Sequence, residues 1–369
     1  MLPGLYIHVP FCRSKCPYCA FYSIPSSSLI PIWLDGLKKE ALLYKGQFDR
    51  FDSLYIGGGT PTFLSRRTLA GMMEHLFTHF DFAPDSEITI EANPCDLSDD
   101  KIRMLRELGF NRVSLGVQSF DDAVLRCMGR RHTAEEAKKA LARLRLFGFD
   151  NVGVDLIYGL EEQSLKEWID TLNCALSFHP EHISCYELTL EKKTVFGRLQ
   201  QEGKIQPLSE EDGRSYFLTT SQVLTESGYI HYEISNFARN HACRSRHNRK
   251  YWQHVPYLGL GPSAHSFLQR DRWWNVRSVR EYCAALGKGL LPVKGRETLT
   301  DEQLRLESLA LGLRIREGVD LRHIASVPQS GTTLSRMEAA GLVKVMDGRI
   351  IPTEEGFLVA DHLPVCFFP

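Results

Sequence analysis

Three cysteines near the start of the chain have a spacing that suits an iron–sulfur cluster. Cys12, Cys16 and Cys19 form a C-x3-C-x2-C pattern within the segment HVPFCRSKCPYC. A four-iron cluster normally binds four protein thiolates, so a loop with three cysteines leaves one iron free to bind a small molecule. Open coordination positions of this kind are where metal ions do chemistry. The pattern therefore predicts a reactive 4Fe–4S cluster.

We expect the fourth ligand to be S-adenosylmethionine, because its amino and carboxylate groups can chelate iron. An electron passed from the cluster can then split the sulfonium into methionine and an adenosyl radical. The alternative use of the three cysteines is a zinc loop or a set of buried structural thiols. Zinc usually takes four protein ligands from paired motifs, and no second cysteine pair follows in this sequence. The spacing therefore favours the cluster.

Composition and charge are those of an ordinary soluble protein. The chain has 369 residues, of which 43% are hydrophobic, and its net charge of −1 gives no general attraction to nucleic acid or anionic lipid. No apolar run approaches the roughly 18 residues of a membrane helix, and the start MLPGLYIHVPFC lacks a signal peptide pattern. Seven cysteines outside the motif are scattered singly, which is typical of reduced thiols. We therefore expect a cytoplasmic protein.

Short runs of β-branched and aromatic residues alternate six times with helical patterns in the first half of the chain. The predicted strands are 5–9, 53–57, 87–91, 112–117, 151–157 and 182–188, and the helical stretches between them include 29–45, 65–79, 134–147 and 164–177. This alternation is typical of parallel strands with right-handed crossovers. The sequence predicts an α/β fold, an open partial (β/α)6 barrel related to the TIM barrel.

Polar and glycine-rich groups follow the ends of these predicted strands, where parallel barrels gather their reacting groups. The cysteine loop follows the first strand, and Gly57-Gly58-Gly59 ends the second. Glu91 ends the third strand, Gln118 ends the fourth and Asp155 lies in the fifth. We therefore expect these residues to meet at one end of the barrel.

The chain divides into three predicted parts. Residues 1–230 form the barrel, and residues 231–295 form a linking segment rich in aromatics and histidines. Residues 296–369 resemble an α+β winged-helix domain, with a hairpin turn at Asp347-Gly348. This last part carries eight Lys and Arg against eleven Asp and Glu, which argues against nucleic acid as its partner.

The residues at the strand ends suit a nucleotide ligand. Glycines allow backbone amides to approach the methionyl end, and Glu91 could accept hydrogen bonds from ribose hydroxyls. Arg130 could pair with the ligand carboxylate, while Gln118 and Asp155 complete a polar ring. Taken singly, each of these residues is more often an ordinary hydrogen-bonded side chain than a ligand contact.

Together these motifs resemble the radical SAM superfamily, and within it the coproporphyrinogen-dehydrogenase-like branch. The resemblance lies in LYIHVPFCRSKCPYCAF, GGGTPT, EANP, GVQSF, GRRH and DLIYGL, and it covers nearly the whole chain. It implies that nine residues contact S-adenosylmethionine: Tyr6, Tyr18, Gly58, Gly59, Thr60, Glu91, Gln118, Arg130 and Asp155. Glu187 and His265 fall near further ligand contacts of the dehydrogenases, where the alignment is loose.

Two members of that branch have different functions. Oxygen-independent coproporphyrinogen III dehydrogenases carry a further cysteine two residues after the third cluster ligand and a long N-terminal extension. This chain has Phe21 at that place, and eleven residues precede Cys12. The segment HNRKYW, residues 247–252, resembles the HNxxYW motif of the HemW branch of heme chaperones. The resemblance therefore favours a heme chaperone over the dehydrogenase.

The same segment also suits heme physically. His247 could ligate iron, Tyr251 and Trp252 could cover the macrocycle, and nearby cations could meet its propionates. Those cations are Arg244, Arg246, Arg249 and Lys250. Two alternatives stay open, which are simple core packing and a zinc site. The candidate zinc ligands are His231, His241, Cys243, His247 and His254.

We therefore expect a protein that binds heme, transfers it to an acceptor protein such as a respiratory protein, and carries the cluster with S-adenosylmethionine. Dimerisation through the cluster is a further expectation. Peripheral association with a membrane is open, because respiratory acceptors are membrane proteins. The rival is a radical enzyme that decarboxylates coproporphyrinogen III. A radical protein that modifies nucleic acid is a third class, which the acidic last part disfavours.

Overall fold

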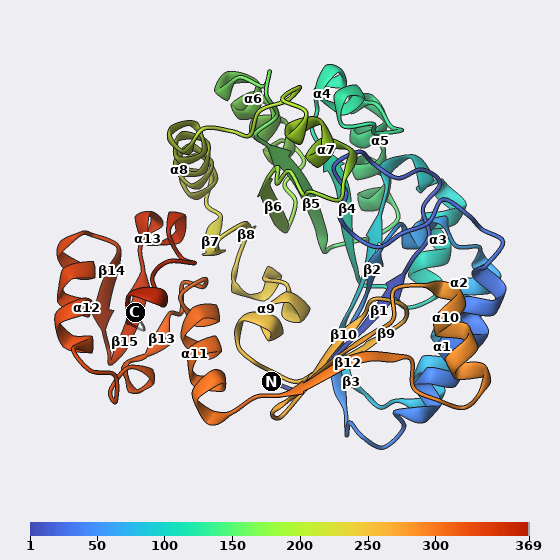
Figure 1. Cartoon of the computed structure of the whole chain (residues 1–369). Coiled ribbons are helices and arrows are strands. Elements are labelled where there is room, and N and C mark those ends of the chain that lie inside the picture. Colours follow the sequence, from blue (N-terminus) through green and yellow to red (C-terminus); the bar gives the residue numbers. More distant parts are fainter. Residues whose placement is uncertain (368–369) are drawn as a thin grey trace.

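Six parallel strands in chain order form the centre of the sheet in the computed structural model, which describes residues 1–367 (Figure 1). They are β1 (Gly4–Val9), β2 (Phe51–Gly58), β3 (Phe82–Ala92), β4 (Arg112–Gln118), β5 (Val152–Tyr158) and β6 (His182–Glu187). Each strand pairs in parallel with the next one along the chain. The predicted α/β fold with an open partial barrel is confirmed.

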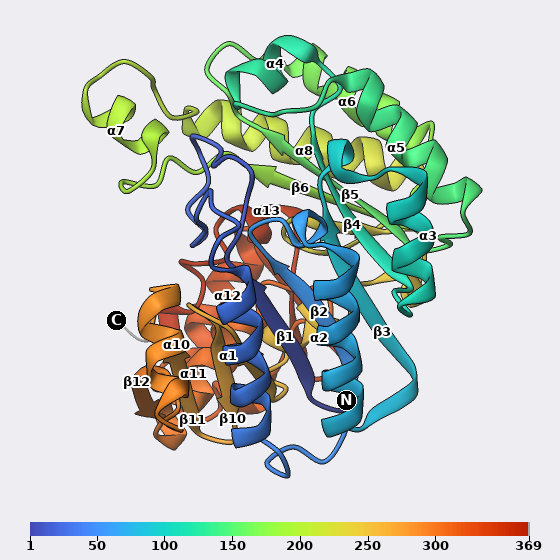
Figure 2. The same ribbon diagram turned by 90° about the vertical axis from the view of Figure 1, so that its right-hand side faces the viewer.

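Helices between the strands cover the convex face of the sheet, as Figure 2 shows for α1, α2 and α3. They are α1 (Ile30–Leu43), α2 (Arg66–His79), α3 (Asp99–Glu107), α4 (Asp122–Cys127), α5 (Ala134–Leu146) and α6 (Leu165–Leu176). Capping boxes at Thr133 with Glu136 and at Ser164 with Glu167 fix where α5 and α6 begin. The helices predicted at 134–147 and 164–177 are therefore present with nearly the predicted bounds.

Segments late in the chain extend the sheet at both edges. Beyond β6 lie β8 (Asn236–Ala238) and β7 (Ile230–Glu233), and beyond β1 lie β9 (Tyr257–Leu260), β10 (His265–Leu268), β11 (Asp271–Asn275) and β12 (Val293–Thr298). β9 is parallel to β1. Beyond it, β10, β11 and β12 each run antiparallel to the preceding strand. Strands within residues 231–295, which were predicted to be a linking segment, thus join the main sheet. The three-part division of the chain stays a prediction.

Four more helices accompany these strands. They are α7 (Val195–Gln201), α8 (Glu210–Glu226), α9 (Arg246–Trp252) and α10 (Val279–Gly287). α10 packs with α1 on the convex side, whereas α9 lies inside the curve of the sheet (Figure 1). The short helix α9 thus occupies the concave face, on which the inward side chains of the barrel strands meet.

The last part of the chain is a small α+β unit. It contains α11 (Asp301–Gly312), α12 (Ser330–Ala339), α13 (Glu354–Leu358) and a sheet with the strand order β13 (Val319–Asp320), β15 (Arg349–Pro352), β14 (Val343–Met346). Asp347 and Gly348 both have positive φ, as the predicted type I′ turn requires. Its apolar core forms a cluster separate from that of the main sheet. Within residues 1–367, every helix is too short or too polar to cross a membrane.

Candidate functional site

A cavity of about 520 Å³ lies at the carboxyl ends of the barrel strands. It is lined by the three cysteines of the motif and by every residue that the resemblance assigns to S-adenosylmethionine. These residues are Cys12, Cys16, Cys19, Tyr6, Tyr18, Gly58, Gly59, Thr60, Glu91, Gln118, Arg130 and Asp155. Residues from 6 to 155 thus meet in one place, although their roles as ligands stay predictions.

The cysteine loop is held by an internal turn and by contacts with residues that follow β2 and α4. The Cys19 N–H donates to the Cys16 carbonyl at 3.1 Å, which closes a turn between them. Thr60 Oγ1 lies 3.4 Å from Cys12 Sγ, and Arg130 Nη1 lies 3.6 Å from Cys16 Sγ. Both side chains are donors to sulfur, and such donors tune the potential of iron–sulfur clusters.

Within residues 1–367, no three side chains of His, Cys, Asp or Glu are grouped in a way that could hold a single metal ion. This finding contradicts the zinc alternative for residues 231–254, because its five candidate ligands do not converge. The finding does not test the predicted cluster, because a cluster contains four irons and each cysteine binds a different one.

The glycine triplet allows the end of β2 to pack against the cysteine loop and Glu91. A Cβ atom at Gly57 would lie 2.6 Å from Glu91 Oε1, and one at Gly59 would lie 2.6 Å from the Phe11 carbonyl oxygen. Gly58 has a φ of +107°, which favours glycine. The Gly59 N–H donates to the Val9 carbonyl at 2.7 Å, so this amide is already used within the loop. The glycines therefore serve close packing, and the role of Gly58 and Gly59 as ligand contacts stays a prediction.

Glu91 is a buried carboxyl with two donors. Tyr55 Oη donates to Oε1 at 3.0 Å, and the Gly58 N–H donates to Oε2 at 3.0 Å. Burial raises the pKa of Glu91 to about 7, and the charge of Asp155 adds to this effect. The Glu91 carboxyl is therefore partly protonated near neutral pH and gains charge as the pH rises.

We expect the affinity for S-adenosylmethionine to rise from about pH 6 to about pH 8, since the pKa of Glu91 is about 7. A protonated carboxyl is a weaker acceptor for ribose hydroxyls than a carboxylate, because hydrogen bonds to charged groups are stronger. Equilibrium binding over this pH range measures the effect. Glu91→Gln should bind less tightly and lose the pH dependence, and a variant that keeps the same pH profile would remove Glu91 from the predicted contact.

Gln118 at the end of β4, Asp155 in β5 and Arg130 after α4 also line the cavity. Arg130 Nη2 donates to the Gly116 carbonyl at 2.6 Å, and Asp155 Oδ2 accepts from Ser114 Oγ at 2.8 Å. Arg130 Nε and Gln118 Oε1 are buried and have no hydrogen-bond partner among the described residues. Buried polar atoms normally have partners. These two atoms therefore fit a cavity that takes a polar ligand.

Several lining residues were not predicted from the sequence. Arg112, Ser114, Gly116 and Gln118 alternate along β4, and all four line the cavity. His182, Ser184 and Tyr186 do the same along β6. The signal that could have revealed them is the period of two in a strand, since Gln118 and Asp155 already identify the inward face.

The HNRKYW segment forms α9, and its histidine is buried away from the cavity. His247 is 1% exposed, and its ring nitrogens lie 3.0 Å from Ser53 Oγ and 2.9 Å from Tyr251 Oη. Burial, with a smaller contribution from the charge of Lys250, lowers the pKa of His247 to about 3. From this segment Asn248 lines the cavity, whereas His247, Tyr251 and Trp252 do not.

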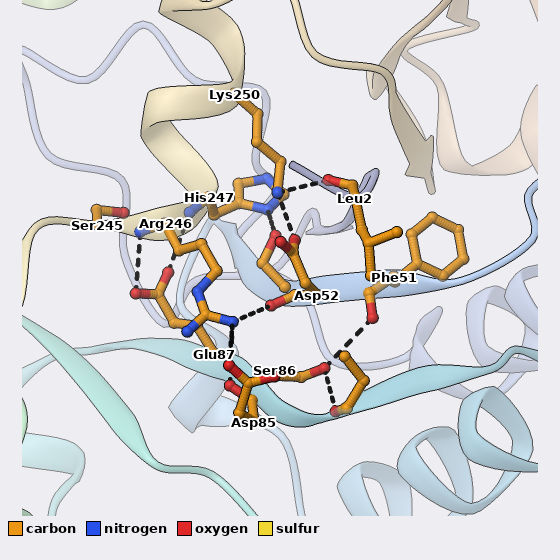
Figure 3. A network of polar contacts seen from close by, with 12 residues as sticks. Leu2, Phe51, Asp52, Asp85, Ser86, Glu87, Ser245, Arg246, His247 and Lys250 are labelled. Atoms are coloured by element: carbon orange, nitrogen blue, oxygen red, sulfur yellow. Dashed lines mark hydrogen bonds and ion pairs between the residues drawn. The ribbon is translucent and has the colours of Figure 1, made fainter. Parts of the chain in front are cut away.

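The cations around His247 are matched by carboxylates. Figure 3 shows Lys250 and Arg246 pointing from α9 toward β2 and β3, where they meet Asp52 and Asp85. Arg244 and Arg249 both pair with Glu317.

The N-terminus of α9 is held by a further carboxylate. Both oxygens of Glu87 accept backbone N–H groups, from Arg246 at 3.0 Å and from His247 at 3.1 Å. The structure thus gives these motif residues internal partners. Contact of His247 with heme stays a prediction, and it would require this network to open.

Comparisons with known proteins agree with this architecture. A family model of the radical SAM superfamily matches residues 6–175, and a model of the HemN C-terminal domain matches residues 299–359. The chain is 36% identical over 369 residues to the heme chaperone HemW of Bacillus subtilis, covering 98% of this chain and 96% of that protein. A second relative is the radical S-adenosyl methionine domain-containing protein 1, mitochondrial, of Bos taurus. It is 32% identical over 375 residues, covering 97% of this chain and 82% of that protein.

A solved structure has the same fold over nearly the whole chain. Coproporphyrinogen III oxidase (HemN) from Escherichia coli, described as a radical SAM enzyme, matches with a TM-score of 0.86 and 26% identity. The match covers 99% of this chain and 90% of the other. A relative named as a heme chaperone and a solved structure named as an enzyme thus both match nearly the whole chain, so the fold does not separate the two functions.

Proposed function

Because this chain belongs to the HemW family within the radical SAM superfamily, we propose that it is a heme chaperone, which binds heme and transfers it to an acceptor protein. The observation that carries the proposal is the 36% identity to a HemW protein over 98% of the chain. The HNRKYW segment and the absence of a further cysteine at Phe21 support it.

We also propose that Cys12, Cys16 and Cys19 hold a 4Fe–4S cluster and that the cavity beside them binds S-adenosylmethionine. The bound cluster would supply an electron for reductive cleavage of the sulfonium. The chain's own residues bind and orient the ligand. Arg130 would meet its carboxylate, and Glu91 would accept from its ribose hydroxyls. The unpartnered Arg130 Nε and Gln118 Oε1 fit this role.

The cellular compartment and the protein partners are part of the same proposal. All ten cysteines are free thiols, which fits a reducing compartment such as the cytoplasm. The acceptor would be a heme protein, such as a respiratory one, and docking to it needs no membrane-spanning helix of this chain. We further propose that two copies associate when their clusters are loaded. Gel filtration under anaerobic conditions, with and without the cluster, measures this association.

An anaerobic assay separates the chaperone from the enzyme. The reconstituted full-length chain is supplied with S-adenosylmethionine and a reductant, first with heme and apo-acceptor and then with coproporphyrinogen III. We expect heme binding and transfer to the acceptor, with no decarboxylated product. Steady formation of the vinyl product would instead assign the chain to the dehydrogenases, and failure to bind heme at all would overturn the chaperone proposal.

A further inference from the structure

We propose that the inner end of the cavity, between Arg112 of β4 and His182 of β6, binds a small organic carboxylate in addition to the predicted S-adenosylmethionine. This ligand is distinct from heme, so its binding is independent of the chaperone function. The sequence motifs assign no role to either side chain.

The cavity extends along the whole length of β4. Arg112 is the first residue of this strand and Gln118 is the last, and both line the cavity. At about 3.3 Å per residue, they lie roughly 20 Å apart along the strand. Ser245 and Asn248, at the start of α9, line the cavity as well, and Figure 1 shows α9 inside the curve of the sheet. The cavity therefore reaches well beyond the carboxyl ends of the strands.

His182 offers an unused hydrogen-bond donor at this inner end. The residue is 2% exposed and lines the cavity, and its Nδ1 atom is buried without a hydrogen-bond partner among the described residues. Burial lowers the pKa of His182 well below its usual range, so the ring is neutral near pH 7. A neutral imidazole has one N–H group. Which ring nitrogen carries that proton is decided by the partner of the other one.

Tyr232 settles the position of the proton. Its Oη lies 2.7 Å from His182 Nε2 and accepts the Ser245 N–H at 3.4 Å. Within residues 1–367 the hydroxyl has no acceptor other than Nε2. The hydroxyl therefore donates to Nε2, and the ring proton is on Nδ1. His182 Nδ1 is thus a donor that no group of the described chain uses.

Arg112 is a buried cation with no carboxylate at ion-pair distance among residues 1–367. Its Nη1 donates to Asn151 Oδ1 at 2.8 Å and to the Cys243 carbonyl at 3.2 Å, whereas its Nη2 makes no hydrogen bond within the same residues. Buried charges are normally paired. The Arg112 guanidinium therefore has both an unbalanced charge and a free donor at the cavity wall.

Gly153 of β5 leaves space between these two donors. It pairs with His182 on the neighbouring strand β6. A Cβ atom at Gly153 would lie 3.6 Å from His182 Nδ1 and 3.7 Å from Arg112 Nη2, both ordinary contact distances. A ligand group can therefore approach the Gly153 backbone between the two nitrogens. A carboxylate, which has two acceptor oxygens and no donor, suits a position with donors on both sides.

The surrounding charges favour a ligand with a single negative charge. Asp155 and Glu91 also line the cavity, and Asp155 already accepts from Ser114 Oγ at 2.8 Å. A phosphate monoester carries about 1.5 to 2 negative charges near neutral pH, so these carboxyl groups would repel it more strongly than a carboxylate. The ligand class is therefore a carboxylate rather than a phosphate.

The test is a titration of the anaerobically reconstituted full-length chain with acetate, followed by saturation-transfer NMR. We expect saturable binding to the wild type and binding at least about tenfold weaker in Gly153→Ala, because the methyl group takes the space between the donors and hydrogen bonds to charged groups are strong. Gly71→Ala on α2 is the matched control, since its Cβ atom would meet Lys38 Nζ alone, at 3.7 Å. It should bind acetate like the wild type.

A second pair of variants separates binding from folding. His182→Phe removes the Nδ1 donor, whereas His182→Asn keeps an amide donor near the same position. Both variants lose the hydrogen bond with Tyr232, so both lose its contribution to stability. We expect acetate binding to be lost in His182→Phe and retained in part in His182→Asn. Equal acetate affinities in the two variants would remove His182 from the site.

Three further results would overturn the proposal. They are the absence of saturable acetate binding to the wild type, an unchanged acetate affinity in Gly153→Ala, and tighter binding of inorganic phosphate than of acetate. Gly153→Ala should also bind S-adenosylmethionine like the wild type. An equal loss of both ligands would mean that the inner end belongs to the S-adenosylmethionine site. Heme transfer is measured separately, so failure here is distinct from failure of the chaperone function.

Discussion

Replacing Cys16 with alanine is expected to reduce bound iron and inorganic sulfide from about four of each per chain to near zero after anaerobic reconstitution. Cys12→Ala and Cys19→Ala should behave in the same way. The predicted site has three thiolates, and the loss of any one leaves a second iron without a protein ligand. The three sulfur atoms line one cavity, and the loop that carries them is held by the ends of β1 and β2. Iron and sulfide analysis with absorption spectra measures the effect.

The chain provides matched controls for this experiment. Cys127 and Cys366 are exposed free thiols that do not line the cavity. Their replacement by alanine should leave the iron and sulfide content unchanged. Equal loss of iron in these controls would mean that reconstitution loads surface thiols. Full iron content in the Cys16→Ala variant would exclude the predicted cluster site.

Asp52→Ala is expected to destabilise the protein by about 3–5 kcal/mol, because it leaves the Lys250 ammonium buried without its counter-ion. Lys250 is 0% exposed and pairs with Asp52, and its Nζ also donates to the Leu2 carbonyl at 2.7 Å. Burial lowers the pKa of Lys250, whereas Asp52 raises it. Chemical denaturation measures the change. Asp35→Ala, which breaks the exposed pair with Lys39, should cause no measurable change.

A double variant separates the charge effect from packing. Lys250→Met with Asp52→Leu replaces the buried pair by apolar side chains, and such replacements are often neutral or stabilising. We expect this double variant to recover most of the stability lost in Asp52→Ala. A double variant as unstable as the single one would show that the two side chains contribute through shape and hydrogen bonds rather than as a charge pair.

This network changes how variants of the HNRKYW segment are interpreted. His247 stacks on Tyr55, with ring centroids 5.2 Å apart, and Tyr55 donates to Glu91 in the cavity. A change at His247 therefore reaches the cavity through two side chains even if heme never touches the ring. Loss of heme binding in a His247 variant would not by itself identify a ligand, so such variants need a stability measurement beside the heme titration.

The cavity was the most predictable part of the molecule. The cysteine spacing and the rule that parallel barrels react at their strand ends are local signals, and they correctly brought Glu91, Gln118 and Asp155 to one place. The alternation of short strands and helices was likewise enough to predict six parallel strands.

The rest depended on contacts between distant parts of the chain. β9 pairs with β1 although about 250 residues separate them. The local pattern of residues in a strand does not indicate which distant strand it pairs with. The sequence also states residue types but not burial, so His247 and Lys250 resembled ligands although the fold buries both side chains. The close packing of the glycine triplet against the Val9 and Phe11 carbonyls also depends on a distant segment, and the predicted contact of Gly58 and Gly59 with the ligand stays a prediction.

The central claim is that a loop of three cysteines holds a cluster whose open iron binds S-adenosylmethionine beside the strand ends. Electron paramagnetic resonance of the reduced, anaerobically reconstituted chain, recorded before and after addition of S-adenosylmethionine, tests it most directly. We predict a reduced 4Fe–4S signal that changes shape when the ligand is added. An unchanged signal, or a protein that contains zinc and no inorganic sulfide, would contradict the claim.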